Sequence, residues 1–193
     1  MSQSVGESSP SSSISSNCES PLSTKQSKSK QEILSNPISN MTPPPVVFAK
    51  ILLHILSENK KSKDYFEKIC LNQDGHFTFK MRASIPLFVY LQRILNYVKI
   101  EFSTLIIAMI YIDRICREKV FLNEFNIHRI MLIAIYMAYI YNEDCVYDNK
   151  YLALVSGLSK AEMMALEEDF LDLIEFNLFV SDEVFEQYKK YFV

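Results

Sequence analysis

The chain has 193 residues, of which 49% are hydrophobic and 22% are charged, and its formal net charge is -3. This size and composition predict one globular domain with some additional length. Three glycines in all leave no glycine-rich loop of the kinds that wrap a phosphate, which excludes those nucleotide-binding enzymes. The negative charge also argues against binding to a nucleic-acid backbone.

The four cysteines and three histidines are scattered, with no CxxC pair and no local spacing typical of a zinc site. We therefore expect no metal. Nothing near Met1 resembles a charged segment followed by an apolar one, as in a secretory signal. This pattern predicts a protein that stays in the cytoplasm, the nucleus or both.

Residues 1–45 are rich in serine and poor in large apolar side chains, so they are predicted to be a disordered tail. Three dipeptides have the form of proline-directed phosphorylation sites, although serine-rich tails contain such pairs often by chance: Ser9-Pro10, Ser20-Pro21 and Thr42-Pro43. Three consecutive prolines, Pro43 to Pro45, predict a stiff extended stop. We place the folded domain at 46–193.

Apolar residues at helical spacing predict three helices in the first half of this domain, at 46–59, 85–99 and 103–119. Ser84 is placed to cap the second helix, and Pro86 is tolerated in its first turn. Ser103 is expected to open the third helix, and the cations near its end complement the helix dipole.

The next segment is apolar on every side, from Ile130 to Tyr141, with Asn123 as its expected cap. A membrane span needs about 20 apolar residues, so this run is too short to cross. An apolar helix without a polar face belongs at the centre of a bundle, packed on all sides. His128 and Arg129, at its start, are expected to hydrogen-bond within the fold.

The remaining signals are helical too. The segment NKYLALVS stops at Gly157, and Ser159 with Glu162 forms a capping box for a helix that runs to about Asn177. Ser181 is placed to open a last helix, and only residues 74–79 read as extended or looped. The predicted fold class is therefore all-α.

Several pieces of this sequence together resemble the cyclins, in particular the P/U-type cyclins. The pieces, in order between residues 84 and 180, are SIPLFVYLQRI, IYIDRI, NIHRIMLIAIYMA and YNEDCVYDNKYLALVSGLSKAEMMALEEDFLDLIEFNL. The resemblance implies a single cyclin box of five helices around a buried central helix, with flanking N- and C-terminal helices. It also implies the function of an activating subunit that binds the C helix of a cyclin-dependent serine/threonine kinase.

A protein of this kind has no catalytic activity, cofactor or small-molecule ligand of its own, and binds neither nucleic acid nor membrane. The residues agree, because no nucleophile with a base and no ligand cluster is visible, as a hydrolase or a metal enzyme would need. A kinase-independent adaptor or transcription-factor module with the same fold is the alternative.

Glu167 has apolar neighbours three and four positions away on its predicted helix, so an acid lies on the face expected to be buried. The pattern alone leaves open whether its carboxylate reaches water at the edge of that face. The resemblance implies instead that Glu167 contacts the kinase C helix.

The end of the central helix is the other predicted contact region, comprising Tyr139, Ile140, Asn142 and Asp144. Many cyclins have a lysine where this chain has Ile140. We therefore expect a more apolar contact there, through Tyr139 and Ile140, or a weaker activation; the same departure keeps the adaptor alternative open.

Asp113 is expected to need a cation, because its helix neighbours are largely apolar and an unpaired buried carboxylate is costly. By resemblance to the structural arginine–aspartate pair of cyclin boxes, we expect Arg93 to be that cation. The role of this pair would be architectural.

Overall fold

The computed structural model describes residues 43–71 and 75–192. This part of the chain contains eight helices and no strand, which confirms the all-α class: α1 (Pro44–Lys60), α2 (Tyr65–Leu71), α3 (Leu87–Tyr97), α4 (Phe102–Glu118), α5 (Ile127–Asn142), α6 (Asn149–Ser156), α7 (Lys160–Leu173) and α8 (Asp182–Lys189). None of these described helices is long and apolar enough to cross a membrane. The predicted tail, except for its last three residues, lies outside the described ranges.

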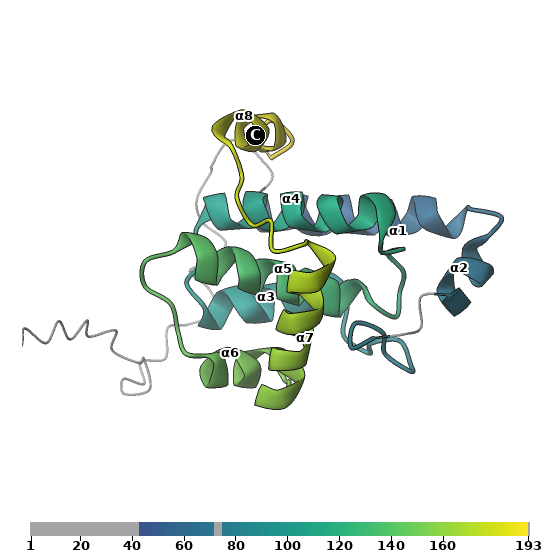
Figure 1. The fold of residues 1–193 in the computed structure, drawn as a ribbon, viewed down its shortest axis with the longest axis horizontal. Helices are drawn as coiled ribbons and strands as arrows, with labels where there is room; N and C mark the ends of the chain where they lie inside the picture. Colours follow the sequence, from purple (N-terminus) through teal and green to yellow (C-terminus); the bar gives the residue numbers. More distant parts are fainter. Residues whose placement is uncertain (1–42, 72–74, 193) are drawn as a thin grey trace, which may run out of the picture. The chain divides into compact units, whose positions relative to one another are not determined.

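The central helix is α5, as its composition predicts. Every residue from Ile130 to Tyr139 is buried. Helices α4, α7 and α3 pack against it, and Figure 1 shows α4 and α3 running along it while α7 crosses it. Because α5 is buried on all sides, its whole apolar surface is removed from water, and the helix needs no polar face.

Helix α1 begins within the three prolines rather than after them. Pro43 has extended backbone angles and is the N-cap, while Pro44 and Pro45 form the first turn. The carbonyl of Pro43 accepts hydrogen bonds from the amides of Val46 and Val47. A first-turn proline costs nothing in hydrogen bonding, because the amides there have no partner within the helix. The prediction of an extended stop through Pro45 was therefore wrong.

Three of the predicted caps are displaced. Helix α3 starts after Pro86 rather than at Ser84, and α4 starts after Glu101, so that Ser103 lies inside its first turn. The third displaced cap is in the turn before α5, where the side chains of Asn123 and Asn126 hydrogen-bond to backbone groups of residues 121–125. The Asn126 side chain accepts from the amide of Asn123 at 2.8 Å, and Asn126, not Asn123, is the N-cap.

The signals for α6 and α7 are confirmed. Gly157 ends α6 in the left-handed conformation, at φ 78°, where a residue with a Cβ would be strained. The capping box of Ser159 and Glu162 opens α7 with both reciprocal hydrogen bonds. Asp148 caps α6 through the amide of Tyr151. Helix α7 ends at Leu173, four residues earlier than predicted.

Helix α2 was not predicted. It is short, and Tyr65 and Ile69 are the side chains that it buries. Beside it, the carboxylate of Glu124 is almost fully buried and forms ion pairs with Lys60 and Arg82. These contacts join the end of α1 and the segment before α3 to the turn before α5.

Candidate functional site

Glu167 on α7 is half-buried, and its carboxylate accepts a hydrogen bond of 3.3 Å from the hydroxyl of Tyr136 on α5. Burial strongly raises the pKa of Tyr136, and the nearby carboxylate raises it further, so this tyrosine stays protonated as a donor. The second carboxylate oxygen of Glu167 has no hydrogen bond within the described part of the chain.

Ile140 belongs to the same face of the molecule. It lies four residues after Tyr136 on α5, which is one helical turn or about 6 Å along the axis. Its side chain is half-buried and packs against the core. Ile140 thus lies one helical turn along α5 from the residue that contacts Glu167.

Tyr139 occupies a different position from the one predicted. Its side chain is only 1% exposed, which leaves no surface for direct contact with a partner. The hydroxyl donates to the carbonyl of Cys145 and accepts from the amide of Tyr147, both at 3.1 Å. Tyr139 thus fastens the segment between α5 and α6, and the predicted apolar contact is reduced to Ile140.

Asn142 and Asp144 are both exposed at the end of α5. The side-chain amide of Asn142 donates to the carbonyl of Ala138 at 2.7 Å and so closes the last turn. Between them, the Glu143 carboxylate accepts hydrogen bonds from Thr104, which is buried, and from the amide of Glu101. The backbone of this segment is anchored, while both predicted contact residues keep exposed surface.

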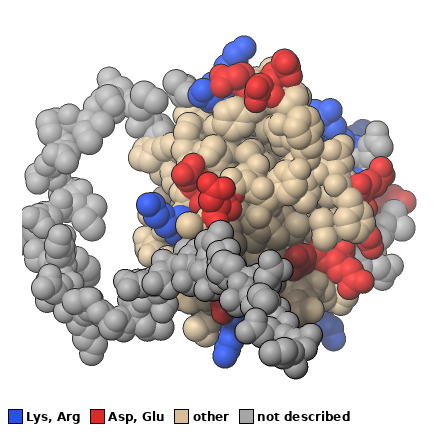
Figure 2. Space-filling model, turned by 60° about the vertical axis from the view of Figure 1, so that its left-hand side comes forward, with Lys and Arg blue, Asp and Glu red and all other residues tan. Residues whose placement is uncertain are grey.

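Figure 2 turns toward the viewer the side of Figure 1 on which α5 ends. Charged side chains form small separate groups on this face, around a broad area without charge. Tyr141, in the last turn of α5, and Val146, in the segment that follows it, are exposed apolar residues. Uncharged, partly aromatic surface of this kind is typical of the centre of protein interfaces.

The predicted pair of Arg93 and Asp113 is not formed. One oxygen of Asp113 accepts from Arg117 at 2.7 and 3.0 Å, and also from the hydroxyl of Tyr188 on α8. Arg117 lies one turn further along the same helix, so it reaches the carboxylate without spanning a helix interface. The guanidinium of Arg93 lies close to Gly157 instead. Asp113 therefore links α4 to α8, not to α3.

Phe176 is a candidate contact that the sequence does not reveal. It lies just after α7, its side chain is 68% exposed, and its φ is 55°. Its amide donates to the carbonyl of Leu171 at 2.9 Å. A bulky side chain in the left-handed conformation is strained, and strain of this kind gathers at functional sites. No local sequence signal marks a phenylalanine for such a conformation.

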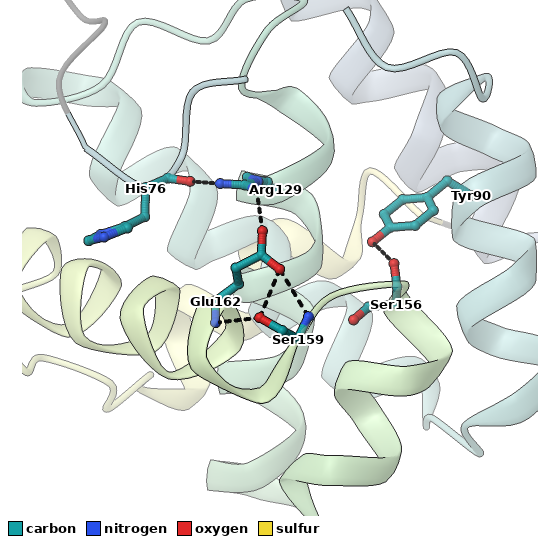
Figure 3. A network of polar contacts seen from close by, with 6 residues as sticks. All are labelled: His76, Tyr90, Arg129, Ser156, Ser159 and Glu162. Carbon is teal, nitrogen blue, oxygen red and sulfur yellow. Dashed lines mark hydrogen bonds and ion pairs between the residues drawn. The ribbon is translucent and has the colours of Figure 1, made fainter. Parts of the chain in front are cut away.

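At the opposite end of α5, Arg129 has partners on three sides. Its guanidinium donates to the carbonyl of His76 and to Glu162 at 3.2 Å (Figure 3). It also stacks over the ring of Phe79, 4.1 Å from the ring centre. Hydrogen bonds from Ser159 lower the pKa of Glu162, so the acid is ionised opposite the cation. This network is internal, as the sequence predicts.

Comparison with known proteins identifies the family. The sequence profile described as Cyclin matches residues 7–178. The chain belongs to the cyclin family. It is 33% identical to Cyclin-U4-3 of Arabidopsis thaliana over 157 residues, which cover 80% of this chain and 69% of that protein. It is 36% identical to Cyclin-P4-1 of rice (Oryza sativa subsp. japonica), covering 55% and 51% of the two chains, and 36% identical to the PHO85 cyclin-like protein psl1 of Schizosaccharomyces pombe, covering 58% and 47%.

These relatives make the chain a P/U-type cyclin and confirm the resemblance in its sequence. The predicted cyclin box corresponds to α3–α7, with α5 as the buried central helix. Its role is regulatory, as that of a cyclin is.

Proposed function

We propose that this cyclin is the activating subunit of a cyclin-dependent serine/threonine kinase and that it binds the C helix of that kinase. The proposed contact face consists of Ile140, Asn142, Asp144, Glu167 and Phe176. The half-buried carboxylate of Glu167, held by Tyr136 with one oxygen unpaired among the described residues, is the observation that carries the proposal. A relative named as PHO85 cyclin-like supports a kinase partner.

The activation would be conformational. A kinase needs its C-helix glutamate paired with the lysine that positions ATP. A cyclin that binds the inward arrangement more tightly than the outward one shifts the kinase toward activity by that difference in affinity. A shift from 1% to 99% active needs a preference of about 5.5 kcal/mol. Such a preference requires a preformed contact face, and the anchored carboxylate and the fixed end of α5 supply one.

Ile140 favours a second candidate function. Its apolar side chain cannot supply the charge that a lysine gives many cyclins at this position. A cyclin-fold adaptor that acts without a kinase would not need that charge. The two functions differ in what copurifies with the protein, because only the first requires a protein kinase in stoichiometric amount.

Phe176 offers a clean test of the contact face. Phe176→Asn removes an exposed aromatic side chain and relieves strain, since asparagine tolerates the left-handed conformation. We expect the variant to be as stable as the wild type and to recover markedly less kinase in affinity purification followed by mass spectrometry. Phe66→Asn, at an exposed phenylalanine on α2, is the matched control and should recover kinase normally. Wild-type protein that recovers no kinase would favour the adaptor.

A further inference from the structure

A groove of about 750 Å³ lies between α1 and α8, over α4, and the kinase-binding proposal does not use it. In Figure 1, α8 lies above α4, while α1 runs along α4. We refer to this groove as the α1–α8 groove. Its apolar lining comes from these three helices and from the residues just after α8: Ile51, Ile55, Met109, Tyr188, Tyr191 and Phe192. Grooves of this size accommodate a few side chains of a bound peptide.

The walls of the groove are held in place by hydrogen bonds. Tyr188 of α8 donates to Asp113 of α4, on the same oxygen that Arg117 contacts. The connection that leads into α8 is fixed as well, because the hydroxyl of Tyr111 donates to the carbonyl of Leu178 at 2.6 Å and Arg114 donates to the carbonyl of Phe179 at 2.8 Å. A groove preformed in this way loses little conformational freedom on binding.

The charges around the groove are mostly basic, although the whole chain carries -3. Lys50, His54 and Arg117 lie along it, and Asp113 is its single lining carboxylate. Asp113 is already bonded to Arg117 and Tyr188. Glu58, one turn from His54, is paired with Lys61 at 2.6 Å. Lys50 forms no ion pair within the described ranges, so its charge is available to an incoming carboxylate.

We propose that the α1–α8 groove binds a short linear segment of a partner protein that carries one or two large apolar side chains next to an acidic residue. The apolar side chains would lie against Ile51, Ile55 and Tyr191, and the carboxylate would meet Lys50. Tyr191 is 72% exposed and presents a rigid aromatic surface at the rim. Aromatic side chains of this kind frequently dominate binding energy.

This groove is separate from the proposed kinase-binding face. It is built on α1, α4 and α8, whereas Glu167 and Phe176 belong to α7 and its end, and α5 packs against both α4 and α7. A cyclin could therefore hold a kinase on one face and a second protein in the groove. The charge complementarity of the groove selects an acidic segment over a basic one.

A library of random twelve-residue peptides displayed on phage and selected on the full-length protein tests this proposal. We expect the enriched peptides to combine acidic and large apolar residues. Their affinities, measured by fluorescence anisotropy, should fall about tenfold for Tyr191→Ala and about fivefold for Lys50→Glu. Leu154→Ala and Lys150→Glu, at exposed positions on α6, are the matched controls and should leave the affinity unchanged.

Three results would overturn the assignment. The first is that the selection yields no binding peptide or enriches basic ones. The second is binding that Tyr191→Ala and Lys50→Glu leave intact. The third is self-association of the wild type that Tyr191→Ala abolishes in sedimentation experiments, which would assign the groove to a second copy of this chain. None of these results depends on the kinase, so the proposed activating function is tested separately.

Discussion

The two ends of α5 use their polar side chains in different ways. At the first end, Arg129 is 14% exposed, and its charge is met by Glu162, the His76 carbonyl and the Phe79 ring. At the last end, Asn142 and Asp144 face solvent, and Ile140 lies at the edge of the core. The same helix thus has one end committed to the fold and one end open to a partner. Where a charged group is mostly buried among its partners within the chain, as Arg129 is, its mutation should act on stability rather than on binding.

Arg129→Ala should have the largest effect on stability. It leaves Glu162 and the His76 carbonyl without their cation and removes the stack over Phe79. We expect a loss of roughly 2–4 kcal/mol in the free energy of unfolding, measured by urea denaturation. Lys150→Ala, at an exposed cation on α6, should stay within about 0.5 kcal/mol of the wild type.

Kinase affinity per folded molecule should not change for Arg129→Ala. A loss of affinity with normal stability would reverse the comparison of the two ends, because it would place the partner at the start of α5.

Tyr139→Phe should have an intermediate effect on the free energy of unfolding, and it tests how the segment after α5 is held in place. It removes the hydroxyl that bonds to Cys145 and Tyr147, which should cost about 1–2 kcal/mol. Hydrogen exchange at the amide of Tyr147 should become faster. Tyr141→Phe alters an exposed tyrosine two positions away and should change neither quantity. Equal exchange in both variants would show that the buried hydroxyl does not hold this segment.

The smallest expected effect is a dependence of stability on pH that arises at the first end of α5. Burial lowers the pKa of His128 below its usual value of about 6.5, while its ring contacts the Ile85 carbonyl and the Tyr90 ring. The unfolded chain therefore binds a proton more readily than the folded one as the pH falls below about 6.5, so stability should decrease over that range.

His128→Gln should reduce the decrease in unfolding free energy between about pH 7 and pH 5. An unchanged pH dependence in His128→Gln would mean that other groups set it.

The features that the sequence predicts are those that local signals determine. The apolar run that became α5, the glycine that ends α6 and the capping box that opens α7 each depend on a few neighbouring residues. The misplaced features depend on which of several possible partners a side chain reaches in the folded chain, one turn away in some cases and on another helix in others. Asp113 found Arg117 and Tyr188 instead of Arg93, and Tyr139 turned inward, because the packing of α8 and of the segment after α5 decides these contacts.

The sequence likewise predicts only part of the candidate site. Glu167 could be found because an acid among apolar neighbours is visible in sequence, but its bond to Tyr136 could not. Phe176 could not be found at all, since its left-handed backbone follows from how α7 ends.

Kinase affinity of Glu167 variants tests the central claim most directly. Because the carboxylate accepts from Tyr136, Glu167→Ala should lower stability by only about 1 kcal/mol. If Glu167 also contacts the kinase, the same change should weaken kinase binding by about 2 kcal/mol or more, roughly thirtyfold, in titrations with the copurified kinase. Glu167→Gln should be milder, and Tyr136→Phe separates the internal bond from the interface. Unfolding of Glu167→Ala with undiminished kinase affinity per folded molecule would contradict the account and place the partner on another face.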